Sequence, residues 1–192
     1  GRLAHAFLLT GIRGVGKTTT ARIIAKALNC IGDGSKKDPS FEICNNCSPC
    51  QSINNGNFLD VIEVDAASRT GVDGIREIID SVIYSPNNAR YKVYIIDEVH
   101  MLSNAAFNAL LKTLEEPPQN VKFIFATTEI KKIPATIISR CQKFDLQRVD
   151  LKTLSNHLKN ICQNESISYE NDSISHICNC LLYTSPSPRD PT

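Results

Sequence analysis

Gly11-Ile12-Arg13-Gly14-Val15-Gly16-Lys17-Thr18 is the segment that makes the rest of the sequence interpretable. It matches the phosphate-binding loop pattern G-x-x-x-x-G-K-S/T at every fixed position. Residues 5–10 before it are apolar and predict a buried strand, and residues 18–28 after it carry apolar side chains at helical spacing. A strand, a glycine loop and a helix in this order are the context that the pattern requires, which leaves a chance match as the weaker interpretation.

The residue types of this loop suit a bound phosphate chain. Its glycines let backbone N–H groups point inward, and the helix that follows adds the positive end of its dipole. Lys17 is expected to reach the β- and γ-phosphates, and the Thr18 hydroxyl to bind Mg²⁺. The predicted nucleotide-binding residues are Gly11, Gly14, Val15, Gly16, Lys17, Thr18 and Thr19.

Composition narrows the class of protein. The 192 residues suffice for one domain with a substantial core and a small second one. The net charge of +1 gives no general electrostatic reason to bind nucleic acid or a membrane, so any DNA contact must come from a local surface or from partners. No apolar run approaches the roughly 18 residues of a membrane span, and no signal peptide is recognisable after Gly1.

Four of the eight cysteines are spaced like metal ligands: Cys30, Cys44, Cys47 and Cys50. Zn²⁺ favours tetrahedral thiolate ligation, and four ligands without an open position indicate a structural rather than a catalytic ion. An iron–sulfur cluster is less favoured by the spacing, and free or disulfide-bonded cysteines remain the alternative. The metal would stabilise a polar insert at residues 30–50, and a thiolate site beside a nucleotide loop indicates a reducing, cytoplasmic compartment.

A second acidic motif follows an apolar strand predicted at residues 91–96. Asp97 and Glu98 come directly after this strand, which is the arrangement of a Walker B motif. Asp97 is expected to hold Mg²⁺, directly or through water, and Glu98 to polarise the attacking water. The carboxyl ends of strands are also where ligands bind in open α/β sheets. The alternative, a chance pair of surface acids, is weakened by the preceding phosphate loop.

Two further residues are candidates for the same chemistry. Thr128 follows a strand predicted at residues 121–126, and its hydroxyl would hold the attacking water; the alternative is a threonine chosen for its β-propensity. Arg140 is a candidate arginine finger, which would stabilise charge on a transferring phosphoryl group. Such an arginine often acts on the nucleotide of a neighbouring subunit, whereas an isolated arginine is more often a surface ion-pair partner.

The pattern of apolar residues predicts an α/β protein with a second, helical unit. Strands are expected at residues 5–10, 58–65, 91–96, 121–126 and 142–146. Helices are expected at residues 18–28, 72–82, 104–114 and 150–161, with another beginning near residue 173. Ser103 and Asp150 are the candidate N-caps.

Several segments together resemble the gamma/tau subunits of bacterial DNA polymerase III, the AAA+ motor family of sliding-clamp loaders. The resemblance covers residues 1–179. It rests on Leu28-Asn29-Cys30 with the cysteine cluster, and on Ile-Asp-Glu-Val-His-Met-Leu-Ser at residues 96–103. It also rests on Leu-Leu-Lys-Thr-Leu-Glu-Glu-Pro-Pro at 110–118, Phe-Ala-Thr-Thr-Glu at 125–129 and Ser-Arg-Cys at 139–141. The cysteine insert separates this family from other clamp-loader subunits.

The resemblance implies a P-loop AAA+ fold with a RecA-like parallel five-stranded sheet, and cofactors ATP, Mg²⁺ and Zn²⁺. It implies catalytic roles for Lys17, Asp97, Glu98, Thr128 as sensor 1, and Arg140 as a finger acting in trans. It further implies magnesium ligation by Thr18 and Asp97, and zinc ligation by the four cysteines. The implied activity is ATP hydrolysis in loading the sliding clamp onto primed DNA. The implied partners are the other clamp-loader subunits, the sliding clamp and DNA, within a DNA-directed DNA polymerase (nucleotidyltransferase) whose polymerase site lies elsewhere.

The expected organisation is a core at residues 1–146, part of a helical lid at 147–179 and a disordered tail at 180–192. Family members carry further residues before Gly1, and their lid and collar extend further, so a fragment is expected. The tail resembles the translation of a sequencing adapter rather than a lid. Two other interpretations remain: a non-hydrolysing AAA+ scaffold subunit, and another AAA+ DNA motor such as a branch-migration helicase, which the cysteine cluster disfavours.

Overall fold

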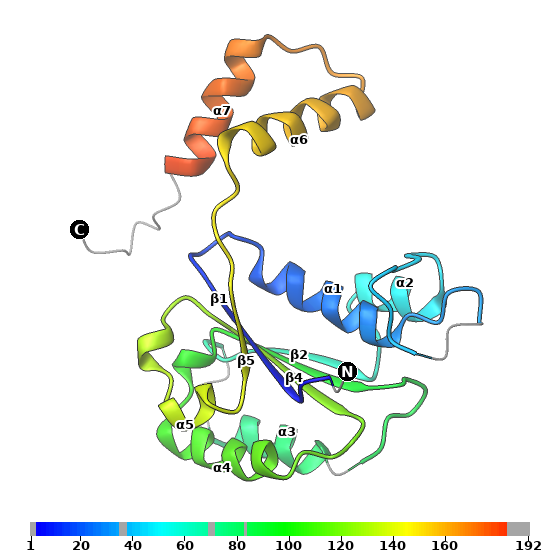
Figure 1. Ribbon diagram of the computed structural model, residues 1–192, viewed down its shortest axis with the longest axis vertical. Helices are drawn as coiled ribbons and strands as arrows, with labels where there is room; N and C mark the ends of the chain where they lie inside the picture. Colours follow the sequence, from blue (N-terminus) through cyan, green and yellow to red (C-terminus); the bar gives the residue numbers. More distant parts are fainter. Residues whose placement is uncertain (1–2, 35–37, 69–71, 83, 184–192) are drawn as a thin grey trace. The chain divides into compact units, whose positions relative to one another are not determined.

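The computed structural model describes residues 3–34, 38–68, 72–82 and 84–183 (Figure 1). The described residues form two compact units, one holding residues 3–11 and 16–146 and the other residues 12–15 and 147–183. The elements of the first unit are β1 (Ala6–Thr10), α1 (Lys17–Asn29), α2 (Ser48–Asn54), β2 (Val61–Asp65), α3 (Val72–Val82), β3 (Lys92–Asp97), η1 (Val99–Met101), α4 (Asn104–Glu115), β4 (Val121–Thr127), η2 (Ile130–Lys132), α5 (Ala135–Ile138) and β5 (Gln142–Asp145).

The first unit is built on a five-stranded sheet in the order β2-β3-β4-β1-β5, in which every neighbouring pair is parallel. Helices α1 and α2 lie on one face, and α3 and α4 on the other (Figure 1). This confirms the predicted α/β fold with a parallel five-stranded sheet. Because all strands run the same way, the carboxyl ends of β1, β3 and β4 lie at one edge, which is where open sheets of this kind bind ligands.

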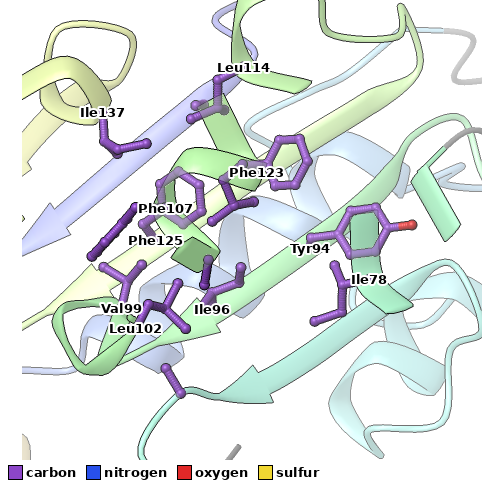
Figure 2. Packing of buried hydrophobic residues seen from close by; sticks show 14 of the residues in the cluster. Ile78, Tyr94, Ile96, Val99, Leu102, Phe107, Leu114, Phe123, Phe125 and Ile137 are labelled. Carbon is purple, nitrogen blue, oxygen red and sulfur yellow. The ribbon is translucent and has the colours of Figure 1, made fainter. Parts of the chain in front are cut away.

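Two hydrophobic clusters, one on each face, hold the sheet between its helices. On β3, Tyr94 and Ile96 point to the α3 and α4 side, whereas Val93 and Ile95 point to the α1 side. Figure 2 shows the first cluster, in which Phe107 of α4 lies beside the strand side chains. A strand covered on both faces is mostly apolar, which explains why the central strands β1, β3 and β4 are nearly continuous apolar runs rather than alternating ones.

Two features of the first unit differ from the sequence-based expectation. Helix α2 (Ser48–Asn54) was not expected; Pro49 occupies its first turn, where the missing N–H is tolerated, and Ile53 is buried. Strand β2 begins at Val61 rather than at residue 58. The residue before it, Asp60, still accepts the Val93 N–H through its backbone carbonyl at 2.8 Å, and its side chain binds a loop.

The Asp60 carboxylate fixes the loop that leads into β3. It is 2% exposed and accepts backbone N–H groups from Asn87, Asn88 and Ala89, each at 2.9 Å. We expect Asp60→Ala to lower the free energy of unfolding by about 1.5–3 kcal/mol, because hydrogen bonds to a buried charge are lost and three donors lose their acceptor. Urea denaturation measures this loss. Asp80→Ala is the matched control, since Asp80 is exposed on α3; equal midpoints for the two variants would contradict the expectation.

The second unit contains α6 (Leu151–Asn164) and α7 (Asn171–Tyr183), which pack on each other. Asp150 caps α6 by accepting the N–H of Thr153 at 2.6 Å, as its position predicts. Residues 180–183, which were expected to belong to a disordered tail, are helical, because α7 continues to Tyr183. No Gly or Pro interrupts residues 180–183, so nothing ends the helix there. The remaining residues of the expected tail, 184–192, lie outside the described residues.

Candidate functional site

The turn between β1 and α1 depends on glycine. Gly16, the residue before α1, has φ 95° and ψ 23°, and Gly14 has φ 78°. These are left-handed conformations, which side chains other than glycine adopt at a cost. A Cβ at Gly16 would meet nothing within 4 Å, so the backbone conformation and not the available space requires glycine here.

The first two residues of α1, Lys17 and Thr18, follow this turn. Lys17 is 6% exposed, and its Nζ donates to the Gly11 carbonyl at 3.1 Å. The Thr18 hydroxyl donates to Oδ2 of Asp97, 79 residues further along the chain. The helix that follows the glycine turn is therefore joined directly to the end of β3.

Asp97 and Thr18 offer the donor set of a hard divalent cation. Asp97 is the last residue of β3, and its Oδ1 accepts the N–H of Glu98 at 2.9 Å, which orients the carboxylate. A hydroxyl and a carboxylate oxygen at hydrogen-bonding distance are the ligands that Mg²⁺ takes from proteins, with its other positions left to water and phosphate. The residues present thus fit the predicted ion.

Glu98 is held in an unusual conformation at the end of β3. Its backbone has φ 45° and ψ 46°, a left-handed conformation that costs about 1–3 kcal/mol for a residue with a side chain. Its Oε2 accepts the backbone N–H of Thr128 at 3.2 Å and the Thr128 hydroxyl at 3.1 Å. The structure thus brings together Glu98 and Thr128, which follow the neighbouring strands β3 and β4.

Three residues around Glu98 are not among the predicted site residues: His100, Glu129 and Thr127, the threonine before the predicted Thr128. The His100 ring lies between the two acids, with Nδ1 3.3 Å from Glu98 Oε2 and Nε2 3.4 Å from Glu129 Oε1. Its Nδ1 also lies 3.0 Å from the Thr127 hydroxyl, which accepts the Glu129 N–H at 3.0 Å. The sequence indicates only that polar residues follow both β3 and β4. These residues can be predicted to meet only when β3 and β4 are known to be neighbours in the sheet.

Arg140 and Thr19 have no described contact with these residues. Arg140 donates to Glu115 Oε1 at 2.6 Å and to the Thr136 carbonyl at 2.8 Å, which fixes its side chain at the end of α4. Thr19 is exposed on α1. Within the described residues the structure therefore joins Thr18 to Asp97 and Thr128 to Glu98, whereas the Lys17 amine bonds the Gly11 carbonyl and Arg140 bonds Glu115.

The four predicted zinc ligands converge between the end of α1 and the start of α2. The sulfur atoms of Cys30, Cys44, Cys47 and Cys50 all lie within 4.8 Å of one another. The sulfurs of Cys30 and Cys44 are 3.6 Å apart, without a disulfide. A tetrahedron with Zn–S distances of about 2.3 Å has sulfur–sulfur edges of about 3.8 Å, so the cluster has the dimensions of a four-thiolate zinc site.

The surroundings prepare one thiol for metal binding and hold the cluster in place. N–H groups of Cys47 and Asn46 lower the pKa of Cys44 to about 6, which favours the thiolate that binds metal, whereas burial raises the pKa of Cys50. The Arg90 guanidinium donates to the Leu28 carbonyl at 2.7 Å. This bond ties the last turn of α1, and with it Cys30, to the segment that leads into β3, which begins at Lys92.

Comparison with known proteins gives a consistent result. A family model described as DNA polymerase III, delta subunit, matches residues 1–150. The DNA polymerase III subunit gamma of Buchnera aphidicola (subsp. Acyrthosiphon pisum) is 54% identical over 92% of this chain and 48% of its own length. The subunit tau of Escherichia coli is 51% identical over 88% of this chain and 26% of its own length. The chain belongs to the gamma/tau subunit family of DNA polymerase III.

Solved structures show the fold of this gamma/tau family member. A gamma subunit-related protein of Thermotoga maritima matches with a TM-score of 0.53 at 21% identity, covering 80% of this chain and 45% of that protein. The RuvB Holliday junction branch migration motor of the same organism matches with a TM-score of 0.60 at 20% identity, covering 92% and 48%. At these identities the matches show a shared fold alone, the AAA+ P-loop fold.

The gamma/tau chain spans about half, or less, of the length of the curated relatives that it matches. Within its described residues, no helix combines the length and the apolar character needed to cross a membrane.

Proposed function

We propose that the chain is the ATP-binding and ATP-hydrolysing part of a clamp-loader motor subunit, which loads the sliding clamp onto primed DNA during replication. The observation that carries this proposal is the bond between Thr18 and Asp97. It joins the glycine turn after β1 to the acids after β3, as a single Mg²⁺–triphosphate site requires. The family membership supports the setting, a multi-subunit replication complex in the cytoplasm.

Each residue of the proposed site has a separate role in ATP hydrolysis. Lys17 would bind the β- and γ-phosphates, and Thr18 and Asp97 would hold Mg²⁺, which neutralises charge on the phosphates when bound. Glu98 would accept a hydrogen bond from the attacking water and withdraw its proton, with Thr128 fixing the Glu98 carboxylate. The roles of Gly11, Gly14, Val15, Gly16 and Thr19 in nucleotide binding rest on the loop pattern.

Three further roles complete the proposal. Arg140 would act on the nucleotide of a neighbouring subunit, which agrees with its contacts to Glu115 and Thr136 rather than to residues of this site. The four cysteines would hold a structural Zn²⁺ that stabilises the insert. Residues 147–179 would form part of a lid. The other clamp-loader subunits, the sliding clamp and primed DNA are the proposed partners.

Lys17→Ala in the full-length protein tests the nucleotide site. We expect ATP affinity to fall by at least about 10–100-fold, because each charge-assisted hydrogen bond to phosphate that is lost contributes about 1.5–3 kcal/mol. Titration with a fluorescent ATP analogue measures the affinity. Lys26→Ala is the matched control, since Lys26 lies on the same helix and bonds to Asn45 and Asn54. An ATP affinity in Lys17→Ala equal to that of the control would refute the proposed site.

A further inference from the structure

His100 is a nearly buried polar residue that the proposed mechanism does not use. Its side chain is 6% exposed, although it belongs to the short helix η1 directly after the acids. Both ring nitrogens face polar groups: Nδ1 faces Glu98 and Thr127, and Nε2 faces Glu129. Glu129 is in turn held by Lys132 at 2.9 Å. A buried ring placed between two carboxylates has a more specific role than filling space.

The contacts of Glu98 are unevenly distributed over its two oxygens. Oε2 receives both hydrogen bonds from Thr128 and lies 3.3 Å from His100 Nδ1. Within the described part of the chain, no contact of this kind is recorded for Oε1. The Glu98 side chain is 28% exposed, so solvent reaches it. One oxygen is therefore fixed by the protein, and the other is available to a water molecule.

We propose that His100 is a positioning residue for Glu98: its Nδ1–H, shared between the Thr127 hydroxyl oxygen at 3.0 Å and Glu98 Oε2 at 3.3 Å, holds Oε2 against the end of β4, so that Oε1 faces the attacking water. This inference rests on the proposed ATPase function, in which Glu98 accepts the proton of that water. His100 itself touches neither water nor nucleotide in this scheme, and it acts through the orientation of the Glu98 carboxylate.

The surroundings of the ring favour this role. Glu98 has a left-handed backbone, which the local chain does not favour, so its side-chain direction depends on contacts from elsewhere. Those contacts come from Thr128 and from His100, and His100 is itself fixed to β4 through Thr127. A partner that orients a catalytic carboxylate in this way typically contributes about 10–100-fold to activity.

Substitutions at position 100 can distinguish the contribution of Nδ1 from that of Nε2. An Asn side chain at position 100 places its amide near the Nδ1 position, whereas a Gln side chain reaches toward the Nε2 position. We expect His100→Ala to lower kcat for ATP by about 10–100-fold in the full-length protein within its assembled complex. ATP affinity should change by less than about threefold. His100→Asn should restore most of kcat, and His100→Gln should remain as low as His100→Ala.

His157→Ala is the matched control, because His157 is exposed on α6. If the kcat of His100→Ala equalled that of the wild type, or if Asn and Gln restored kcat equally, the inference would be overturned.

A crystal structure of His100→Ala provides a readout that does not need turnover. We expect Glu98 Oε2 to leave the Thr128 N–H, now at 3.2 Å; an unmoved carboxylate would refute the positioning role. A wild-type complex without ATP hydrolysis would instead refute the proposed function, and the crystal structure would still decide the role of His100.

Discussion

Glu98→Gln in the full-length protein within its complex is expected to lower kcat for ATP hydrolysis by about 10²–10⁴-fold, because an amide cannot take the proton of the attacking water. ATP affinity should stay close to that of the wild type, since Glu98 is not among the residues proposed to bind phosphate or Mg²⁺. The glutamine oxygen can still accept the two hydrogen bonds that Thr128 donates to Glu98 Oε2. The variant should therefore bind ATP and retain it.

Phosphate release under saturating ATP measures kcat, and titration with a fluorescent ATP analogue measures affinity. Glu116→Gln is the matched control, because Glu116 is an exposed acid at the end of α4. A kcat for Glu98→Gln within a few-fold of the control would show that another group activates the water. A wild-type complex that binds ATP without hydrolysing it would instead favour the scaffold alternative.

Loss of Cys50, a proposed zinc ligand, is expected to unfold the cysteine insert. Structural Zn²⁺ in small four-ligand sites contributes about 10–16 kcal/mol of binding free energy, which is also folding free energy for the segment that it holds. Cys50 is fully buried at the start of α2, and a serine there supplies neither the thiolate nor the same packing. Cys50→Ser should release zinc, expose residues 38–57 to proteolysis and lower the melting temperature.

A colorimetric zinc assay on denatured protein measures metal content, and limited proteolysis reports on the insert. The wild type should contain one zinc per chain. Cys162→Ser is the matched control, since Cys162 lies on α6 outside the cluster. Wild-type protein without zinc, or an insert in Cys50→Ser as resistant to proteolysis as in the control, would contradict a structural zinc site.

The two predictions concern the proposed nucleotide site, which includes Lys17 and Thr18 at the start of α1, and the cysteine cluster, which includes Cys30 at its end. The helix begins at Lys17 of the phosphate loop and ends beside Cys30, a proposed zinc ligand. Its last turn is also bound to the start of β3, where Asn29 exchanges two hydrogen bonds with the backbone of Tyr91. Unfolding of the insert should therefore also loosen the elements that carry the nucleotide site, so Cys50→Ser is expected to weaken ATP binding more than Cys162→Ser does.

Local patterns in the sequence were sufficient for the element types, the phosphate loop, the acids after β3 and the cysteine ligands. These features depend on residues close together in the chain: helical or continuous apolar spacing, glycines at left-handed positions, and paired cysteines two residues apart. For the same reason Ser103 and Asp150 were identifiable as N-caps, since each bonds an N–H three residues ahead. Helix α2 was not predicted because it is only seven residues long and has few apolar residues, and its cysteine was interpreted as a metal ligand.

Contacts between segments far apart in the chain could not be predicted from the sequence and were found only in the tertiary structure. The bond from Thr18 to Asp97, the loop held by Asp60 and the placement of His100 between Glu98 and Glu129 all depend on strand order. The central strands β1, β3 and β4 are buried on both faces and are mostly apolar, so their sequences do not show which strand lies beside which. The sequence by itself therefore specified which groups could act on a nucleotide, and the packing of the sheet decided which of them meet.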